Sequence, residues 1–375
     1  MIIKSKNVWV NEQFCEAKII IEDGIIKDVV SYDDDVVDID YGDLKIIPGL
    51  VDIHSHGYNG MNANYATYDG LLHWTKQLCK EGVTSYLVTT STANKASLLK
   101  SMEIIANVME RNVDGANILG IHMEGPLISF ECRGAQSPYD IQKPDVDDFK
   151  DFEKASKDHI RLVCIASEMD KDHKLIKYCH NKNIKVTLGH TNASYEEYLK
   201  AFEDGADSFT HTFNGMNSLH HRKPGVPGAA MSIDEMYAEC ICDGVHVHKS
   251  VVKALSRCKG KDKLILVTDA VQIKGLKPGV YEFVDRTVTI GEDGCGRLAN
   301  GKLAGSSNSM IKMLANAIAF GIDEVSAINA CTKNPCELLN EDHKGIIAKG
   351  YDADLVVIDN DYNVKETYVL GKSML

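Results

Sequence analysis

Tryptophan, proline and long apolar runs are all scarce in this chain of 375 residues, which contains two tryptophans and eight prolines. No apolar run approaches the roughly 20 residues of a membrane-spanning helix, so we expect no membrane insertion. The N-terminal stretch MIIKSKNVWVNEQF lacks the apolar segment of a signal peptide. No lysine- or arginine-rich run offsets the net charge of -13, and a nucleic-acid surface needs such clustered cations, so we expect no nucleic-acid partner.

Closely spaced cysteine pairs are also nearly absent. Eleven cysteines are scattered from Cys15 to Cys336, and only Cys240 and Cys242 are separated by a single residue. This odd number of cysteines, in a chain of this length, indicates reduced thiols in a cytoplasmic protein. Alternation along a strand would place Cys240 and Cys242 on one face, where we expect them to pack in the core.

The middle of the chain alternates between short apolar stretches and helix-like segments such as 68–81 and 95–111. Strands that alternate with helices indicate parallel βαβ units, and eight such units predict a closed (β/α)8 barrel, the TIM-barrel fold. The turn-rich residues 278–301 predict a hairpin inserted after the eighth strand. The eight predicted strands span residues 46–53, 83–89, 117–123, 160–166, 184–188, 208–211, 238–242 and 263–268.

Both chain ends have a different texture, with β-branched stretches separated by polar turns. Short strands fill residues 1–46, and two more are expected near the C-terminus, at 353–359 and 364–369. We therefore predict a discontinuous organisation in two domains. The predicted domains are a small β-sandwich formed by both chain ends, residues 1–48 plus 345–375, and a catalytic TIM barrel at 49–344.

Side chains that can bind metal ions follow the predicted strand ends. His54 and His56 follow the first strand, Glu124 the third, His190 the fifth, His211 the sixth and Asp269 the eighth. The carboxyl ends of the strands form the catalytic face of a TIM barrel, so residues far apart in the sequence should converge there. Imidazoles and a carboxylate suit zinc or a similar divalent ion that keeps an open position for water. The sequence therefore predicts a metal-dependent enzyme.

Some of these residues allow more than one interpretation. His54 and His56 share one face of their strand, so they could hold a second ion or form a wall of the pocket. Asp269 could be a helix cap or a turn residue, but its position beside the predicted metal ligands favours general acid–base catalysis. For His122 we prefer a structural role, with its side chain directed to the other side of its strand from Glu124.

The stretch 48–57, PGLVDIHSHG, resembles the first-strand motif of the amidohydrolase superfamily. Further segments resemble the N-acetylglucosamine-6-phosphate deacetylase family, in the order of that family and over nearly the whole chain. These segments are 122–126, 189–191, 210–216, 243–246, 267–270 and 303–307, and residues 350–355 resemble the superfamily's return to its small β domain. The resemblance implies hydrolysis of the acetamide of N-acetyl-D-glucosamine 6-phosphate to glucosamine 6-phosphate and acetate, in amino-sugar catabolism.

The resemblance also implies a role for each site residue. Glu124, His190 and His211 would hold the main metal, and Asp269 would be the catalytic acid–base. The implied cofactor is one or two divalent ions per subunit, with zinc preferred over iron, manganese or cobalt. The implied substrate contacts are Ala135, Gln136, Asn214, Gly215, His246, Leu303, Ala304 and Gly305, with Arg222 reaching the phosphate in the neighbouring subunit of a homodimer.

The chain departs from the family pattern at Gln136, where the family commonly has a histidine that orients or polarises the acetyl group. Glutamine can donate a hydrogen bond but carries no charge, so N-acetylgalactosamine 6-phosphate stays open as an alternative substrate.

Other amidohydrolases, acting on a cyclic amide or a dipeptide, are a second alternative. Those with strongly binuclear centres often have a bridging lysine after the fourth strand, where this chain has Glu168. A non-enzymatic barrel scaffold would have a broken set of metal ligands, whereas this set is complete.

Overall fold

The computed structural model describes residues 1–33, 35–111, 113–283, 287–293 and 295–375, and its centre is a barrel of eight parallel strands. The strands, in spatial order, are β6 (Leu50–Ser55), β9 (Val83–Thr90), β10 (Asn117–Glu124), β11 (Ile160–Ile165), β12 (Lys185–Leu188), β13 (Ser208–Phe209), β14 (Tyr237–Ile241) and β15 (Leu264–Val267). The barrel closes where Ser55 bridges Ala270 and the amide of Asp269 donates to the carbonyl oxygen of His54 at 2.9 Å. The predicted TIM barrel is confirmed, and each of its eight strands overlaps a predicted strand.

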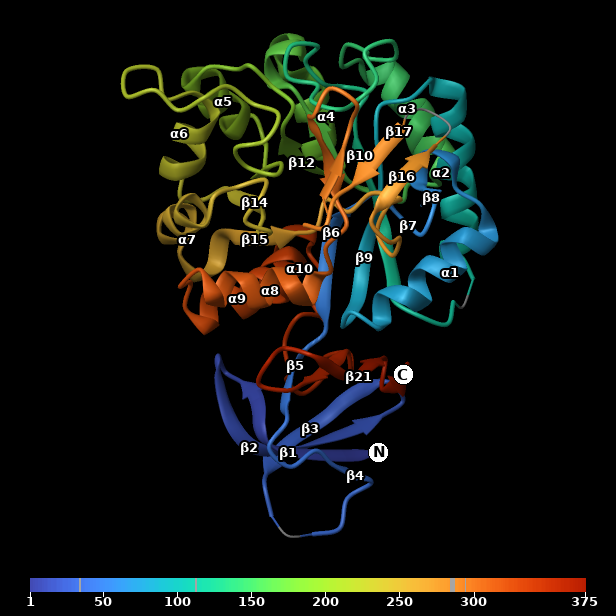
Figure 1. Cartoon of the computed structure of the whole chain (residues 1–375), viewed down its shortest axis with the longest axis vertical. Coiled ribbons are helices and arrows are strands. Elements are labelled where there is room, and N and C mark those ends of the chain that lie inside the picture. Colours follow the sequence, from blue (N-terminus) through green and yellow to red (C-terminus); the bar gives the residue numbers. More distant parts are fainter. Residues whose placement is uncertain (34, 112, 284–286, 294) are drawn as a thin grey trace.

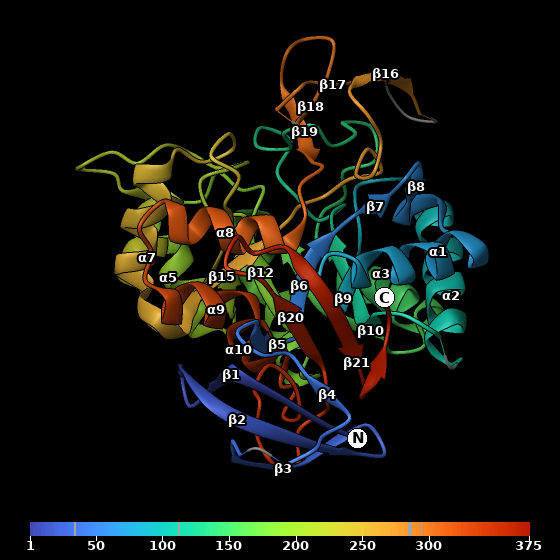
Figure 2. The same cartoon turned by 60° about the horizontal axis from the view of Figure 1, so that its bottom comes forward.

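The helices cover the outside of the barrel (Figure 2). Several begin after a residue of a type that favours the N-cap position: the side chains of Thr67, Asn94 and Ser194 each accept a hydrogen bond from a backbone N–H three residues later. Within the described ranges, no helix combines the length and apolar composition of a membrane span. The helices are α1 (Tyr68–Cys79), α2 (Lys95–Met109), α3 (Val146–Ala155), α4 (Lys174–Asn181), α5 (Tyr195–Glu203), α6 (Gly225–Ser232), α7 (Lys249–Lys263), α8 (Met310–Ala319), α9 (Glu324–Cys331) and α10 (Lys333–Leu339), with short 3-10 turns at Ala63–Tyr65, Ser167–Met169 and Lys171–His173.

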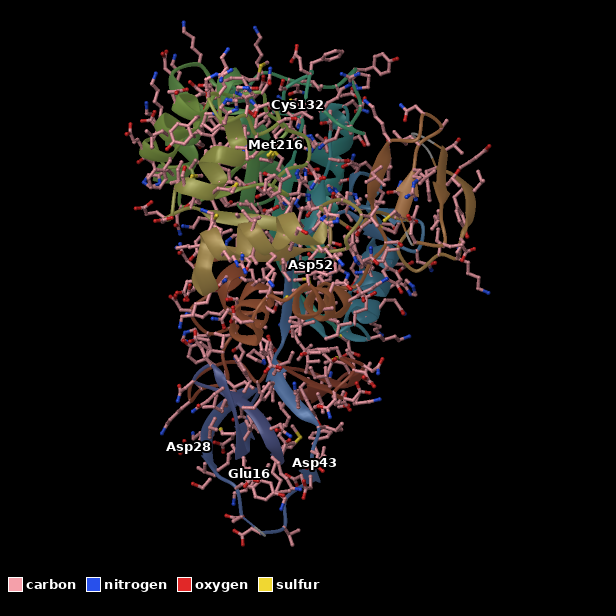
Figure 3. The ribbon with its side chains drawn as sticks, turned by 60° about the vertical axis from the view of Figure 1, so that its left-hand side comes forward. Glu16, Asp28, Asp43, Asp52, Cys132 and Met216 are labelled. Atoms are coloured by element: carbon pink, nitrogen blue, oxygen red, sulfur yellow. The ribbon has the colours of Figure 1, made fainter. Side chains whose placement is uncertain are left out.

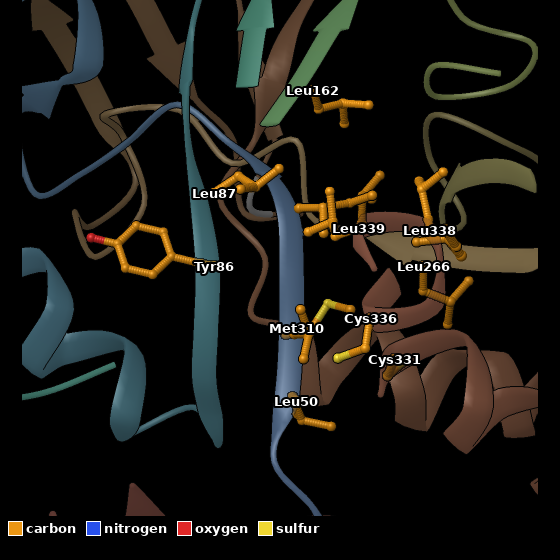
Figure 4. Packing of buried hydrophobic residues seen from close by; sticks show 14 of the residues in the cluster. Leu50, Tyr86, Leu87, Leu162, Leu266, Met310, Cys331, Cys336, Leu338 and Leu339 are labelled. Atoms are coloured by element: carbon orange, nitrogen blue, oxygen red, sulfur yellow. The ribbon is translucent and has the colours of Figure 1, made fainter. Parts of the chain in front are cut away.

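The barrel strands are apolar because both of their faces are covered. Every residue of β6 and β9 is buried, and the strand side chains share one core with the helices. Figure 4 shows Leu50 and Leu266 in this cluster with Met310 of α8 and Leu339 of α10. Two further core residues are Cys240 of β14 and Cys242 just beyond it, as predicted, and all eleven cysteines are free thiols.

A second sheet, with strands of both chain ends, lies at one end of the molecule and carries both termini (Figure 1). The two ends of the chain meet where β5 pairs antiparallel with β20. Its strands are β22 (Lys372–Ser373), β21 (Val364–Val369), β20 (Leu355–Ile358), β5 (Lys45–Pro48), β1 (Ile2–Val10), β2 (Gln13–Glu22) and β3 (Ile25–Ser31), and β4 (Ile39–Asp40) pairs with β1. The boundaries of a separate small domain stay a prediction.

The first predicted barrel strand, 46–53, is divided in the structure. Its beginning belongs to β5 of the terminal sheet, and its continuation belongs to β6 of the barrel. Gly49 lies between them, packed against β9 so closely that a Cβ would come within 2.0 Å of Thr84 Oγ1. One continuous apolar run therefore contributes a strand to each of two sheets. Its hydrophobicity alone does not predict this division.

The insertion after the eighth barrel strand is larger than the predicted hairpin. It forms a four-stranded antiparallel sheet of β16 (Gly279–Glu282), β17 (Thr287–Ile290), β18 (Cys295–Arg297) and β19 (Leu303–Ser306). Residues 284–286 and 294 of that prediction lie outside the described residues. This sheet lies on the opposite side of the barrel from β1–β3 (Figure 2). A short pair, β7 (Gly57–Tyr58) and β8 (Met61–Asn62), follows the first barrel strand.

Candidate metal centre and active site

Three predicted site residues have an unusual backbone conformation. His190, His211 and Asp269 each lie two residues beyond the end of their strand, with φ of 47°, 26° and 45°. Left-handed backbone is uncommon and costly for residues other than glycine, and it gathers at functional sites. In Figure 3, Cys132 and Met216 lie at this end of the molecule, far from Glu16 and Asp28 on the terminal sheet and from Asp43 in a turn beside it.

Glu124, at the end of β10, is the centre of the cluster. Its Oε1 atom lies 3.0 Å from His190 Nε2 and 2.9 Å from His211 Nε2. The same Oε1 atom lies 3.3 Å from His54 Nε2, and Oε2 lies 3.2 Å from His56 Nε2. The fold thus brings all four predicted histidines to one carboxylate, as the positions of the strand ends predicted.

The hydrogen bonds of the histidine rings show which ring nitrogens can bind a metal ion. His56 Nδ1 lies 3.0 Å from the carbonyl oxygen of Thr89, and His190 Nδ1 lies 2.9 Å from that of Cys132. A carbonyl oxygen only accepts, so both rings carry their hydrogen on Nδ1 and direct the Nε2 lone pair to the cluster. His190 Nε2 also lies 3.1 Å from His211 Nε2. Lone pairs at such distances repel one another unless a cation lies between them.

The donors form two overlapping groups, in each of which the ligand atoms lie within 4.8 Å of one another. One group is His54, His56 and Asp269, and the other is His54, Glu124 and His211. Asp269 Oδ1 lies 3.3 Å from His56 Nε2. Among the described residues, no lysine or arginine lines the pocket beside these acidic groups, and buried anions need a cationic partner. Imidazole nitrogens with carboxylate oxygens fit a divalent metal ion.

The acidic and imidazole groups shift one another's pKa. Burial raises the pKa of Glu124, but the electrostatic effects of His54 and His190 and the hydrogen bonds to His190 and His211 together outweigh burial and hold that pKa well below its ordinary value. Burial also raises the pKa of Asp269, and the hydrogen bond to His56 together with the electrostatic effects of His54 and His56 outweighs burial and lowers it. Without a metal ion, burial lowers the pKa of His56 while Asp269 and Glu124 raise it to about 9, so a metal ion that binds Nε2 would displace a proton from this ring. Both carboxyls are therefore ionised at neutral pH, as a metal ligand and a general base must be.

A pocket of about 200 Å³ opens beside the cluster. Its lining includes eight of the nine predicted substrate contacts: Ala135, Gln136, Asn214, Gly215, His246, Leu303, Ala304 and Gly305. The ninth, Arg222, does not line this pocket. It lies in an exposed loop, with Nη1 2.7 Å from His221 Nε2. The insertion sheet contributes Val288 and the Leu303–Gly305 stretch, so it forms one wall of the pocket.

Gln136 is held in one orientation. Its Oε1 atom accepts hydrogen bonds from the amide of Thr92 at 2.7 Å and from Thr92 Oγ1 at 2.5 Å. Its Nε2 atom consequently faces the cluster and donates to Glu124 Oε2 at 2.9 Å. Gly125 makes room for this arrangement, since a Cβ there would come within 2.3 Å of Thr92 Oγ1. The side chain therefore presents a hydrogen-bond donor to the site.

His246 is held by Asp243, whose Oδ2 atom lies 2.6 Å from His246 Nδ1. Asp243 in turn accepts from the amides of Val245 and His246, both at 2.8 Å. Burial lowers the pKa of His246, and the hydrogen bond to Asp243 together with the charges of Asp243 and Asp269 outweighs burial and raises it. This pair favours an imidazolium at the pocket, which suits an anionic substrate group. Cys295 lies beside the pair, with Sγ 3.7 Å from Asp243 Oδ2.

The prediction for the direction of His122 was wrong. Residues two apart on a strand share a face, so His122 lies on the same side as Glu124. Its ring packs edge-on against His54, with ring centroids 4.6 Å apart. Burial holds its pKa well below the ordinary value, and Nε2 has no partner among the described residues. His122 also stands outside both ligand groups among the described residues, so its structural role stays a prediction.

Sequence reasoning missed several residues of the site. Asn62, Ser91 and Gln272 line the pocket, and nothing in their local sequence distinguishes them from ordinary loop residues. Glu239 carried a signal that was not used, because it is an acidic residue in the middle of a predicted buried strand. Such a residue is almost never fully buried unless it is paired.

This fold and this cluster define a class, a TIM-barrel hydrolase whose strand ends gather imidazoles and carboxylates for a divalent metal ion. The chain belongs to the amidohydrolase family, whose model matches residues 46–374. Within that family it is a hydrolase of the N-acetylglucosamine-6-phosphate deacetylase group, as the sequence resemblance predicted. A metal-free scaffold is therefore not supported.

Three comparisons carry this assignment. The chain is 35% identical to N-acetylglucosamine-6-phosphate deacetylase of Bacillus subtilis (strain 168) over 334 residues, which cover 88% of this chain and 84% of that one. It is 31% identical to N-acetylgalactosamine-6-phosphate deacetylase of Escherichia coli O157:H7, over 87% of each chain. A solved mutant of N-acetyl-D-glucosamine-6-phosphate deacetylase from Mycobacterium smegmatis, in complex with N-acetyl-D-glucosamine 6-phosphate, matches with a TM-score of 0.94 at 28% identity, covering 100% of this chain and 99% of that chain.

Proposed function

We propose that this protein hydrolyses the acetamide of N-acetylglucosamine 6-phosphate to glucosamine 6-phosphate and acetate. The observation that supports this most directly is the position of the metal-binding cluster, which forms part of the lining of the pocket that holds the predicted sugar contacts. The solved relative from Mycobacterium smegmatis is described as a complex with this sugar phosphate.

The proposed metal ligands combine the two donor groups with His190, whose Nε2 lies 3.0 Å from Glu124 Oε1. Glu124, His190 and His211 would hold the main divalent ion, and His54 and His56 a second one, with zinc as the proposed metal. When bound, a divalent ion acidifies water and polarises a carbonyl group.

Asp269 is the proposed acid–base. It lines the pocket and is ionised at neutral pH, so it can take a proton from water as the oxygen attacks the acetamide carbon. The C–N bond then breaks, and Asp269 returns the proton to the departing amine. One carboxyl thus acts first as base and then as acid, and ends in its starting state.

The remaining roles follow from the donors in the pocket. The Nε2 amide of Gln136 is proposed to donate to the acetyl oxygen as negative charge develops there. His246, which Asp243 holds through Nδ1, is proposed to bind the phosphate together with Asn214 and Gly215. The Leu303–Gly305 stretch and Ala135 would pack along the sugar.

We expect Gln136→Met, which keeps the side-chain length and removes the donor, to lower kcat about 100-fold. The physical reason is that the donor acts on charge that exists only in the transition state, so KM should change by less than threefold. Steady-state acetate release measures both constants. Gln142→Met, a glutamine replacement outside the pocket, is the matched control and should behave as wild type. An unchanged kcat in Gln136→Met would contradict the role of the amide.

A homodimer is the proposed assembly, with the exposed Arg222 reaching the phosphate in the neighbouring subunit. A guanidinium binds phosphate through two hydrogen bonds, which would explain an arginine in a loop away from its own pocket. The mass in solution tests the assembly. A cytoplasmic location is proposed from the free thiols.

The experiment that tests the function is acetate release from N-acetylglucosamine 6-phosphate, with its galacto isomer and the unphosphorylated sugar alongside. We expect the gluco phosphate to be the best substrate, and the unphosphorylated sugar to be poor because it lacks the anion. Preference for the galacto isomer would change the assigned substrate to N-acetylgalactosamine 6-phosphate, an alternative that the Escherichia coli relative and Gln136 both keep open. No release from any of the three, in metal-loaded protein, would refute the proposal.

A further inference from the structure

Glu239 is an acidic side chain at the centre of the barrel that the proposed mechanism does not use. It lies in the middle of β14, between Ala238 and Cys240, and both its whole-residue and its side-chain exposure are 0%. The carboxyl group does not line the pocket, so it does not meet substrate. A buried acidic group without a partner is strongly destabilising, so its contacts should account for its presence.

These contacts lead to the metal ligands. Glu239 Oε2 lies 2.9 Å from His54 Nδ1 and accepts a hydrogen bond from the amide of His211 at 3.1 Å. The other oxygen, Oε1, has no partner among the described residues. Both contacts of the carboxyl are thus with residues of the metal cluster. One is with a side chain on β6, and the other is with the backbone that follows β13.

The contact with Glu239 Oε2 determines which ring nitrogen of His54 carries the hydrogen. With its hydrogen on Nδ1 and directed to the carboxyl, His54 keeps a lone pair on Nε2. That atom lies 3.2 Å from His56 Nε2 and 3.3 Å from Glu124 Oε1. His54 is itself 0% exposed and lies outside the pocket lining, whereas His56 lines the pocket. A role of His54 as a pocket wall is therefore disfavoured, and a role as a metal ligand is favoured.

The second contact restrains His211. Its backbone has a φ of 26°, the smallest positive value of the three strained site residues, and strained backbone persists only where its surroundings hold it. The His211 amide donates to the Glu239 carboxyl, and the Thr212 amide donates to the Glu239 carbonyl oxygen at 2.8 Å. One residue of β14 thus holds the backbone that presents His211 to Glu124.

We propose that Glu239 is a positioning residue of a two-ion centre, which fixes the tautomer and orientation of His54 as a ligand of the second ion. A carboxylate behind a metal-binding imidazole raises the basicity of the ring, and its loss weakens metal binding by about 10- to 100-fold. The inference rests on the proposed metal-dependent hydrolase, but it is independent of the sugar that the enzyme hydrolyses.

The test is the zinc content of the purified full-length protein, stripped of metal and then dialysed against a series of buffered free zinc concentrations. We expect two ions per chain in wild type. In Glu239→Gln, the weaker ion should bind about 10- to 100-fold less tightly while the stronger ion is retained. His54→Ala should lose the same weaker ion. Glu153→Gln, which changes a comparably buried acid on α3 outside the pocket, should keep both ions.

The double variant His54→Ala/Glu239→Gln separates positioning from a general structural role. If Glu239 acts through His54, adding Glu239→Gln to His54→Ala should cause no further loss of zinc, because coupled residues are not additive. Thermal unfolding of the metal-free proteins gives a second readout, in which a purely structural role would lower Tm in Glu239→Gln without changing zinc affinity. A lower Tm with unchanged zinc affinity in Glu239→Gln would overturn the proposal. So would a further loss of zinc in the double variant, or a single bound ion in zinc-saturated wild type. None of these outcomes depends on acetate release, so failure of the proposed substrate would be seen separately.

Discussion

Replacing Asp269 with asparagine is expected to lower kcat for acetate release about 1000-fold, which corresponds to about 4 kcal/mol of activation free energy. Asparagine has nearly the same shape, but it cannot take a proton from water or give one to the departing amine. Because binding of the sugar phosphate relies on other side chains, KM should change much less than kcat. Steady-state kinetics with N-acetylglucosamine 6-phosphate, at zinc saturation, measures both constants.

The position of Asp269 requires a control for metal loss. Its Oδ1 atom lies 3.3 Å from His56 Nε2, so the substitution could act by weakening the second ion. Zinc content therefore has to be measured in the same samples. Asp170→Asn is the matched variant, since Asp170 is also buried and accepts amide hydrogen bonds at the start of α4, away from the pocket. A fully loaded Asp269→Asn enzyme with wild-type kcat would contradict the acid–base role.

The second large effect is expected for Glu124→Gln, which should abolish binding of both ions and lower activity below detection. Oε1 of Glu124 faces His190 and His211, and Oε2 faces His56, so a single carboxylate serves both proposed ion positions. The neutral amide removes that negative charge and replaces one acceptor with a donor directed at lone pairs. Zinc content after dialysis at fixed free zinc is the measurement, with circular dichroism to verify the fold.

A comparison of single ligands sharpens this prediction. His190→Ala should lose the main ion alone, and His56→Ala should lose the second ion alone, whereas Glu124→Gln should lose both. Two ions retained in Glu124→Gln would be incompatible with a shared carboxylate. Partial activity restored by excess zinc in His190→Ala, but not in Glu124→Gln, would agree with the central position of Glu124.

The sequence by itself determined the barrel and most of the metal cluster. Eight apolar stretches alternate with helical segments. Both patterns are recognised from hydrophobic periodicity, which depends only on residues that are close in the sequence. A residue such as Glu124 or His190 directly after a strand must lie at the catalytic face, because parallel strands end together there. The convergence of the predicted site residues could therefore be anticipated without knowledge of any distance.

The tertiary structure decided what depends on partners far apart in the chain. The bond between Glu239 and His54 joins residues 185 positions apart, and that between Thr92 and Gln136 spans 44. Such pairs depend on the lateral order of the strands and on barrel closure, for which no local pattern exists. The division of one apolar run at Gly49 has the same origin, since the residues on both sides of Gly49 are largely buried, and it is their pairing with different strands, β20 and β9, that assigns them to different sheets.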